Sequence, residues 1–256
     1  MTDDISRILK AWTYEPGELS VRKITSEDGR DLIQIRMDLG IMQLEWSGRP
    51  DGAIVHERPS LLDHYRAERR RHHSSGSSEP FVLGREDCWA LGQEAMQYYW
   101  RRISFFELKQ YELAEQDAVH NLGILDLCGE FGEHEEDRQI RDQYRVFVTA
   151  HRIQARALKH LEEEDHGKAL AIIRAGITEV EGILRNNGGP EAMETCTELV
   201  FLRDWEQEVE DSRPRSRSEQ LRVDLEAAVE EEEFELAASL RDRLREMDTG
   251  RAHGPR

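Results

Sequence analysis

The sequence predicts a mainly α-helical protein, in which a repeat-like helical bundle follows a small N-terminal antiparallel β-meander and precedes a C-terminal helical hairpin. Three observations favour this fold class. Apolar residues recur at three- and four-residue intervals through most of residues 86–210, as on one face of a helix. Two alternating segments flank an Asp-Gly pair near the N-terminus, the usual signal of a β-hairpin. A second, shorter helical pattern occupies residues 219–248.

We expect residues 1–65 to hold a short helix at 2–12 and then a three-stranded meander. The predicted strands are Leu19–Ile24, Asp31–Met37 and Gly40–Trp46. Asp28-Gly29 supplies the turn between the first two strands. A sheet this small is not stable alone, so a helix or a partner must cover one of its faces.

The composition of residues 66–85 predicts a flexible linker, with a basic run at Arg66–His73 and a Ser-rich stretch after it. The basic run has two interpretations. It contacts phosphate or an acidic protein, or it is the solvated end of a helix, which is the more common case. Both alternatives are left to the structure.

Residues 86–210 predict five long helices joined by short connections, which favours antiparallel neighbours. Their apolar stripes run through Trp89–Phe106, Ala114–Leu125, Ile140–Leu158, Ala169–Leu184 and Met193–Trp205. Two of the bends, at Tyr111–Ala114 and His166–Ala169, resemble the interhelix corner of a tetratricopeptide repeat, where Ala permits close packing. Arg102 falls where that repeat prefers a small residue, whereas Ala157 suits it. The resemblance implies a groove-like peptide-binding surface; the alternative is a plain helical bundle.

Beyond a polar linker at 211–218, the segment Leu221–Arg245 predicts two amphipathic helices folded back at an acidic elbow, and residues 249–256 are expected to be a disordered tail. Ser216 and Glu219 have the spacing of a capping box. About eight apolar side chains at roughly 1.5–3 kcal/mol each oppose an ordering entropy of about 1.5 kcal/mol per residue. An isolated hairpin is therefore marginal, and dimerisation or docking is expected.

The hairpin pattern resembles the UvrB/UvrC motif, or UVR domain. The matching residues are Leu225, Ala228, Val229, Glu232, Phe234, Glu235, Ala237, Ala238, Leu240, Arg241 and Asp242. One departure is Glu233, which stands at the elbow where the family has Asp, a better N-cap than Glu. The resemblance implies a helical hairpin that pairs with another such hairpin, as between two subunits of the bacterial nucleotide-excision-repair nuclease, and that recurs in regulatory and stress proteins. The alternative is a hairpin that caps its own chain.

Composition and charge restrict the partners. Hydrophobic residues make up 38% of the 256 and charged residues 34%, which is polar for a globular protein but short of disorder. A net charge of −18 repels a nucleic-acid backbone, so no direct nucleic-acid binding is expected. The acid is concentrated at 224–235, where a cationic partner surface would be attracted.

Neither a metal site nor a cofactor site is predicted. Cys88, Cys128 and Cys196 are far apart and form no CxxC pair, which argues against a zinc ribbon and a disulfide framework and favours buried free thiols in a reducing cytoplasm. The ten histidines include no HExxH, and the chain has no GxSxG, Walker A, GxGxxG or kinase signature. No signal peptide or apolar run of 18 residues occurs, so we expect a cytoplasmic protein that binds no membrane.

These observations predict a non-catalytic adaptor or regulator that binds a protein, either another UVR-domain protein such as an excision-repair subunit or a second copy of itself. The predicted partner-binding residues are Leu225, Val229, Glu232, Phe234, Ala238, Leu240, Arg241 and Asp242, the charged ones setting register at the rim. One alternative is a regulator of a stress-response enzyme such as a protein kinase, although the cysteine pairs typical of such members are missing. Another is an enzyme that uses Asp38 or Asp51 of the meander.

Overall fold

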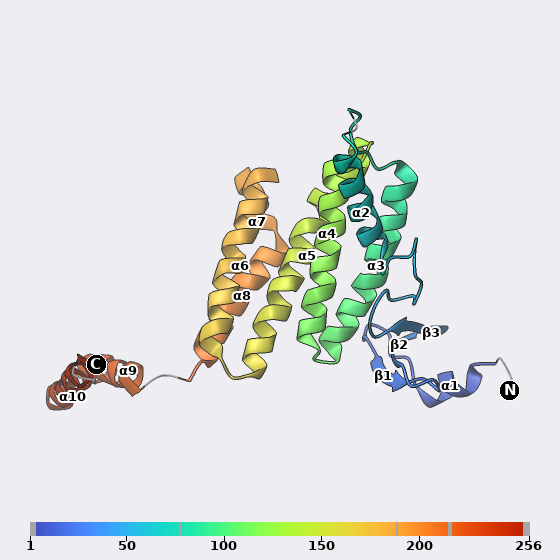
Figure 1. Cartoon of the computed structure of the whole chain (residues 1–256). Coiled ribbons are helices and arrows are strands. Elements are labelled where there is room, and N and C mark those ends of the chain that lie inside the picture. The colour runs from blue at the N-terminus through green and yellow to red at the C-terminus, as the bar shows by residue number, and fades with distance from the viewer. Residues whose placement is uncertain (1–3, 77, 188, 215–216, 253–256) are drawn as a thin grey trace. The chain divides into compact units, whose positions relative to one another are not determined.

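The computed structural model describes residues 4–76, 78–187, 189–214 and 217–252. They form two compact units, Met1–Gln207 and Glu208–Arg256, each of which is treated by itself (Figure 1). The protein is mainly helical, with an N-terminal three-stranded antiparallel sheet and a C-terminal helix pair, which confirms the predicted fold class.

The first unit opens with α1 (Ser6–Ala11) and the sheet β1-β2-β3, whose strands are Val21–Thr25, Asp31–Met37 and Gly40–Glu45. Both pairings are antiparallel, so the predicted meander is confirmed. Gly29 takes a φ of 85° at the turn between β1 and β2, a left-handed conformation that favours glycine.

Helix α2 spans Leu61–Ser74, so the basic run is the end of a helix, the more common of its two interpretations, and the flexible linker predicted from residue 66 does not begin there. The Ser60 hydroxyl accepts a hydrogen bond from the Asp63 N–H and caps the helix. Leu61 and Leu62 are buried in a core cluster with residues of the following helices. Because this apolar start anchors the helix, the basic run continues it as a solvated end instead of beginning a flexible segment.

Four long helices then run antiparallel to their chain neighbours and lie side by side (Figure 1). They are α3 (Arg85–Glu107), α4 (Tyr111–Phe131), α5 (Glu135–Glu162) and α6 (His166–Asn187). The predicted fifth helix is two, α7 (Gly189–Thr195) and α8 (Thr197–Ser212). Thr195 and Thr197 flank the break at Cys196 and use their hydroxyls in local hydrogen bonds, to the Glu191 carbonyl and the Glu198 carboxylate, which weakens helix continuity there.

The bundle supplies the cover that the sheet needs. Ile33 and Ile35 of β2 are fully buried in one cluster with Phe105, Ala114 and Ala155, which come from α3, α4 and α5. The sheet therefore packs on the end of the bundle where α3 meets α4 (Figure 1). No second protein is required to shelter this face.

Two of the predicted bends share one backbone arrangement. Lys109, between α3 and α4, and Glu164, between α5 and α6, both have a positive φ, 55° and 58°. In each corner the next residue's N–H bonds back across the turn, and an Ala four residues after that is fully buried: Ala114 and Ala169. This is a tight αα-hairpin connection. The tetratricopeptide likeness has no support beyond this helical content.

The second unit is dominated by α9 (Arg217–Glu230) and α10 (Phe234–Ala252). Helix α10 continues past residue 248, so the predicted disordered tail does not begin at 249, because the proline that would stop the helix comes only at position 255. The predicted capping box and the rest of the predicted tail involve Ser216 and residues 253–256, which lie outside the described residues.

Candidate protein-interaction surface

The two C-terminal helices close on a small internal core. Leu221 and Ala228 of α9 and Ala237 and Leu240 of α10 are buried, and Leu225 and Leu244 pack against them in part. Ala228 and Ala237 are small residues that let the two helices approach closely. Four buried side chains, two of them alanines, give the hairpin little apolar burial of its own.

The elbow repeats the corner seen twice in the bundle. Glu232 has a φ of 60°, and the Glu233 N–H donates to the Ala228 carbonyl at 2.8 Å. At the α5–α6 corner, Asp165 accepts the Lys168 N–H at 3.0 Å and so caps α6. Glu233 stands at the same place but its side chain makes no such bond within the described part of the chain. A longer side chain reaches this N–H poorly, which is the expected effect of Glu in place of Asp.

The structure divides the eight predicted partner-binding residues. Phe234 and Val229 are the most exposed of the apolar ones, at 68% and 52%, and Leu225 and Ala238 are half-buried. The prediction is corrected for Leu240, which is only 5% exposed and belongs to the hairpin's internal core. The three predicted rim residues are exposed: Glu232, Arg241 and Asp242.

Helical geometry places the exposed apolar residues on one side of the hairpin. Leu225 and Val229 are four residues apart on α9, and Phe234 and Ala238 are four apart on α10, so each pair shares a helix face. Since the helices run antiparallel and meet along Leu221, Ala228, Ala237 and Leu240, these two faces lie on the same side. We call these four residues, Leu225, Val229, Phe234 and Ala238, the hairpin flank.

Two exposed apolar residues were missed by the sequence analysis. Leu236 is about half exposed and lies on the side opposite the hairpin flank, and Val223 points away from the internal core. Neither residue lies on the apolar stripe that fills the core. An apolar residue outside that stripe is the sequence signal that would have identified both as exposed. Arg241 and Asp242 follow Ala238 by three and four residues on α10, so both border the hairpin flank.

Charge is segregated along the hairpin. The elbow holds the exposed run Glu230–Glu233 together with Glu235, whereas the arginines of α10 follow at 241, 243 and 245. The predicted anionic segment is therefore on the surface. A partner that covers the hairpin flank meets negative charge at the elbow and positive charge farther along α10.

Comparison with known protein families decides what this hairpin is. Residues 217–249 match the UvrB/uvrC motif. The match covers both helices and the elbow, so the predicted UVR hairpin is confirmed. No curated protein and no solved structure matches the chain.

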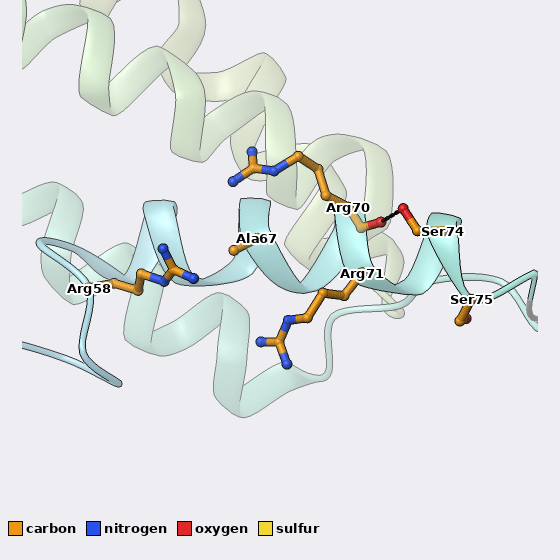
Figure 2. A pocket seen from close by; sticks show the side chains of 6 residues that line it. All are labelled: Arg58, Ala67, Arg70, Arg71, Ser74 and Ser75. Atoms are coloured by element: carbon orange, nitrogen blue, oxygen red, sulfur yellow. Dashed lines mark hydrogen bonds between the residues drawn. The ribbon is translucent and has the colours of Figure 1, made fainter.

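A second candidate site lies at the basic end of α2, where a pocket of about 430 Å³ is lined by Arg58, Arg70 and Arg71 (Figure 2). Figure 2 shows the Arg70 side chain extending to the opposite side of α2 from Arg71, so the guanidinium groups do not converge on one point. Arg71 is already paired with Glu68. This arrangement suits a solvated helix end better than a phosphate cradle.

Asp51, which the sequence analysis considered as a catalytic residue, takes part in interactions that stabilise the fold. Asp51 accepts hydrogen bonds from Ala53 and Gln97 and pairs with Arg49, which fixes the turn after the sheet.

Cys88 and Cys128 are buried free thiols and Cys196 is half-buried. Over the described ranges, no group of three His, Cys, Asp or Glu side chains is placed to hold a metal ion. In the same part of the chain, none of the helices combines the length and apolarity needed to cross a bilayer.

Proposed function

We propose that this protein is a non-catalytic adaptor or regulator that binds a protein partner through the hairpin flank. The observation that carries the proposal is the exposure of Phe234, with Val229 beside it, on a hairpin whose own core holds few side chains. A UVR hairpin is known to mediate protein interactions, and residues 217–249 match that motif.

The bundle offers an internal comparison for Phe234. Tyr111-Glu-Leu-Ala114 starts α4 and Phe234-Glu-Leu-Ala237 starts α10, after corners with the same backbone bonds. The Tyr111 ring lies 6.5 Å from the Phe106 ring and is partly buried, which raises the pKa of Tyr111. Phe234 has no ring neighbour among the residues that the structure describes. The aromatic residue at this position is therefore covered in the bundle, whereas the corresponding one in the hairpin is exposed.

Covering this surface contributes favourable free energy to association. Full burial of a Phe side chain contributes about 1.5–3 kcal/mol, and about two-thirds of that remains available at Phe234. Val229 and the half-buried Leu225 and Ala238 extend the patch. An exposed aromatic in the centre of a small apolar patch with a charged rim is the arrangement of an interface anchor.

The charge pattern bears on the partner. In a pair of identical hairpins with elbows side by side, the five glutamates of one elbow would face five of the other. Self-pairing is therefore favoured only with the elbow of one hairpin beside the arginines of the other. We propose a second UVR-type hairpin as the partner, from an excision-repair subunit or from another copy of this chain in that antiparallel arrangement. Regulation of a stress-response enzyme by the same surface is the second candidate.

The test uses the full chain with the substitution Phe234→Ala and the matched control Val223→Ala, which removes an exposed apolar side chain away from the hairpin flank. Light scattering after size exclusion measures self-association, and a binding assay with a purified UVR-bearing excision-repair subunit measures the heterologous pair. We expect Phe234→Ala to weaken whichever association occurs by at least about tenfold and Val223→Ala to leave it unchanged. Equal loss in both variants, or none in either, contradicts the proposal.

A further inference from the structure

A groove of about 870 Å³ lies between α3 and α5 in the first unit, with α4 as its floor. We call it the α3–α5 groove. Its lining is mostly apolar and includes Trp89, Met96, Tyr99, Ile124, Ile140 and Tyr144. The volume is in the range of small-molecule sites. Four of these side chains are at least 40% exposed, which gathers an uncovered apolar surface in one place: Trp89, Met96, Ile140 and Tyr144.

The groove is long. On α3 it extends from Arg85 to Arg102, which at about 1.5 Å per residue is a length of about 26 Å. An extended chain of methylene groups can lie along this length against the apolar lining.

A charged side chain closes one end of the groove without a partner for its charge. Arg102 is fully buried, and its Nε donates a hydrogen bond to His151 Nδ1 at 3.1 Å. Its Nη1 and Nη2 have no hydrogen-bond partner among the described residues. The rings of Tyr99 and Phe147 are centred 5.5 and 5.9 Å from the guanidinium carbon.

The nearby groups do not neutralise Arg102. Asp117 accepts hydrogen bonds from Arg101 at 2.7 and 2.9 Å and is committed to it. Burial, and then the charge of Arg102, lower the pKa of His151 to about 4, so this imidazole is neutral at pH 7 and its Nδ1 accepts from Arg102 without supplying a negative charge. A buried guanidinium with two unpaired nitrogens is costly unless an anion completes it.

From these observations we infer that the α3–α5 groove binds a small amphipathic carboxylate. The carboxylate pairs with Nη1 and Nη2 of Arg102 in the two-pronged geometry that guanidinium favours. The apolar body extends along Tyr99, Met96 and Ile140 toward Trp89.

The other end of the groove fixes this orientation. Glu136 and Asp137 line it, and the buried Oδ2 of Asp137 has no hydrogen-bond partner in the described part of the chain. Arg85 also lies at this end, but it is already paired with Glu136 at 3.4 Å, so a ligand carboxylate there would face a net negative charge and the Arg102 end is favoured. This inference concerns the first unit alone and does not depend on the hairpin.

The test measures calorimetric binding of dodecanoate to the full chain below the micelle concentration, beside dodecanol and dodecyltrimethylammonium, which have the same tail. We expect dodecanoate to bind at least about tenfold more tightly than either. Within the series from octanoate to dodecanoate, affinity should rise roughly threefold to fourfold for each added methylene. Equal binding of the three headgroups, or no binding of any carboxylate, overturns the inference.

Two matched pairs of variants locate the site. Arg102→Met should reduce dodecanoate binding at least about tenfold and leave dodecanol unaffected, whereas Arg85→Met, at the other end of the groove, should change neither. Met96→Asp places a charge on the exposed middle of the groove and should abolish binding, whereas Leu39→Asp in the β2–β3 turn should not. If circular dichroism shows that Arg102→Met is unfolded, Met96→Asp and the headgroup comparison decide. Retained binding in Met96→Asp, or binding only of an acidic amphipathic peptide, refutes the proposal.

Discussion

Leu240 and Phe234 lie six residues apart on one helix and should respond to truncation in opposite ways. Leu240 is 5% exposed and packs in the core formed by Leu221, Ala228 and Ala237. Replacing a buried Leu with Ala costs about 2–5 kcal/mol, through lost burial and the cavity left behind. The hairpin core is too small to absorb this loss, so Leu240→Ala should unfold α9 and α10.

The corresponding cost at Phe234 is small. Only about a third of this side chain is buried, so Phe234→Ala removes roughly 0.5–1 kcal/mol of folding free energy. Partner binding should be lost in both variants. In Leu240→Ala the loss comes from unfolding, and in Phe234→Ala from the missing anchor on a hairpin that stays folded.

Amide hydrogen exchange of the full chain separates the two effects. A loss of 2 kcal/mol lowers protection in residues 217–252 about thirtyfold, since each 1.4 kcal/mol is a factor of ten. Protection in α3–α5 should not change in either variant and serves as the internal control. Unchanged protection of α9 and α10 in Leu240→Ala would refute the assignment of Leu240 to the hairpin core.

Three further results are expected. Glu233→Asp should raise the stability of the hairpin by about 0.5–1 kcal/mol, measured by hydrogen exchange of α10, because the shorter carboxylate caps the helix. Ser60→Ala should destabilise the first unit by about 1 kcal/mol in urea unfolding, because α2 loses its N-cap. As pH falls from about 6.5 to about 4, the unfolded chain takes up a proton that folded His151 does not, so stability should fall by about 3 kcal/mol, and His151→Gln should flatten this dependence.

Arg102 shows how tertiary packing can give a new context to a residue that fits a sequence pattern poorly. Arg102 was noted only as a residue that departs from the small side chain of a repeat. Its position on α3 follows from the sequence, but its burial does not, because that depends on α5 bringing Phe147 and His151 over it. The unpaired nitrogens that support the ligand proposal are a property of packing between helices far apart in the chain.

The basic run on α2 shows that tertiary contacts can outweigh what the composition of a segment predicts. Composition favoured a linker because arginine, histidine and serine dominate residues 66–78. The helix is nevertheless formed, since Leu61 and Leu62 bury its first turn and the Glu94 carboxylate accepts both of their N–H groups at 2.7 and 3.2 Å. Composition indicates how polar a segment is, whereas the burial of two leucines and two hydrogen bonds to Glu94 at one end of the helix stabilise its structure.

The sequence alone determined most of the secondary structure of this protein through interactions between residues close together in the chain. Turn residues such as Gly29, and apolar spacings of two or of three and four, predicted the meander, the long helices and the UVR hairpin, because each depends on residues near one another in the chain. Tertiary structure decided which apolar face is covered. Leu240 and Phe234 belong to the same helical pattern, but the antiparallel packing of α9 buries the first and leaves the second exposed.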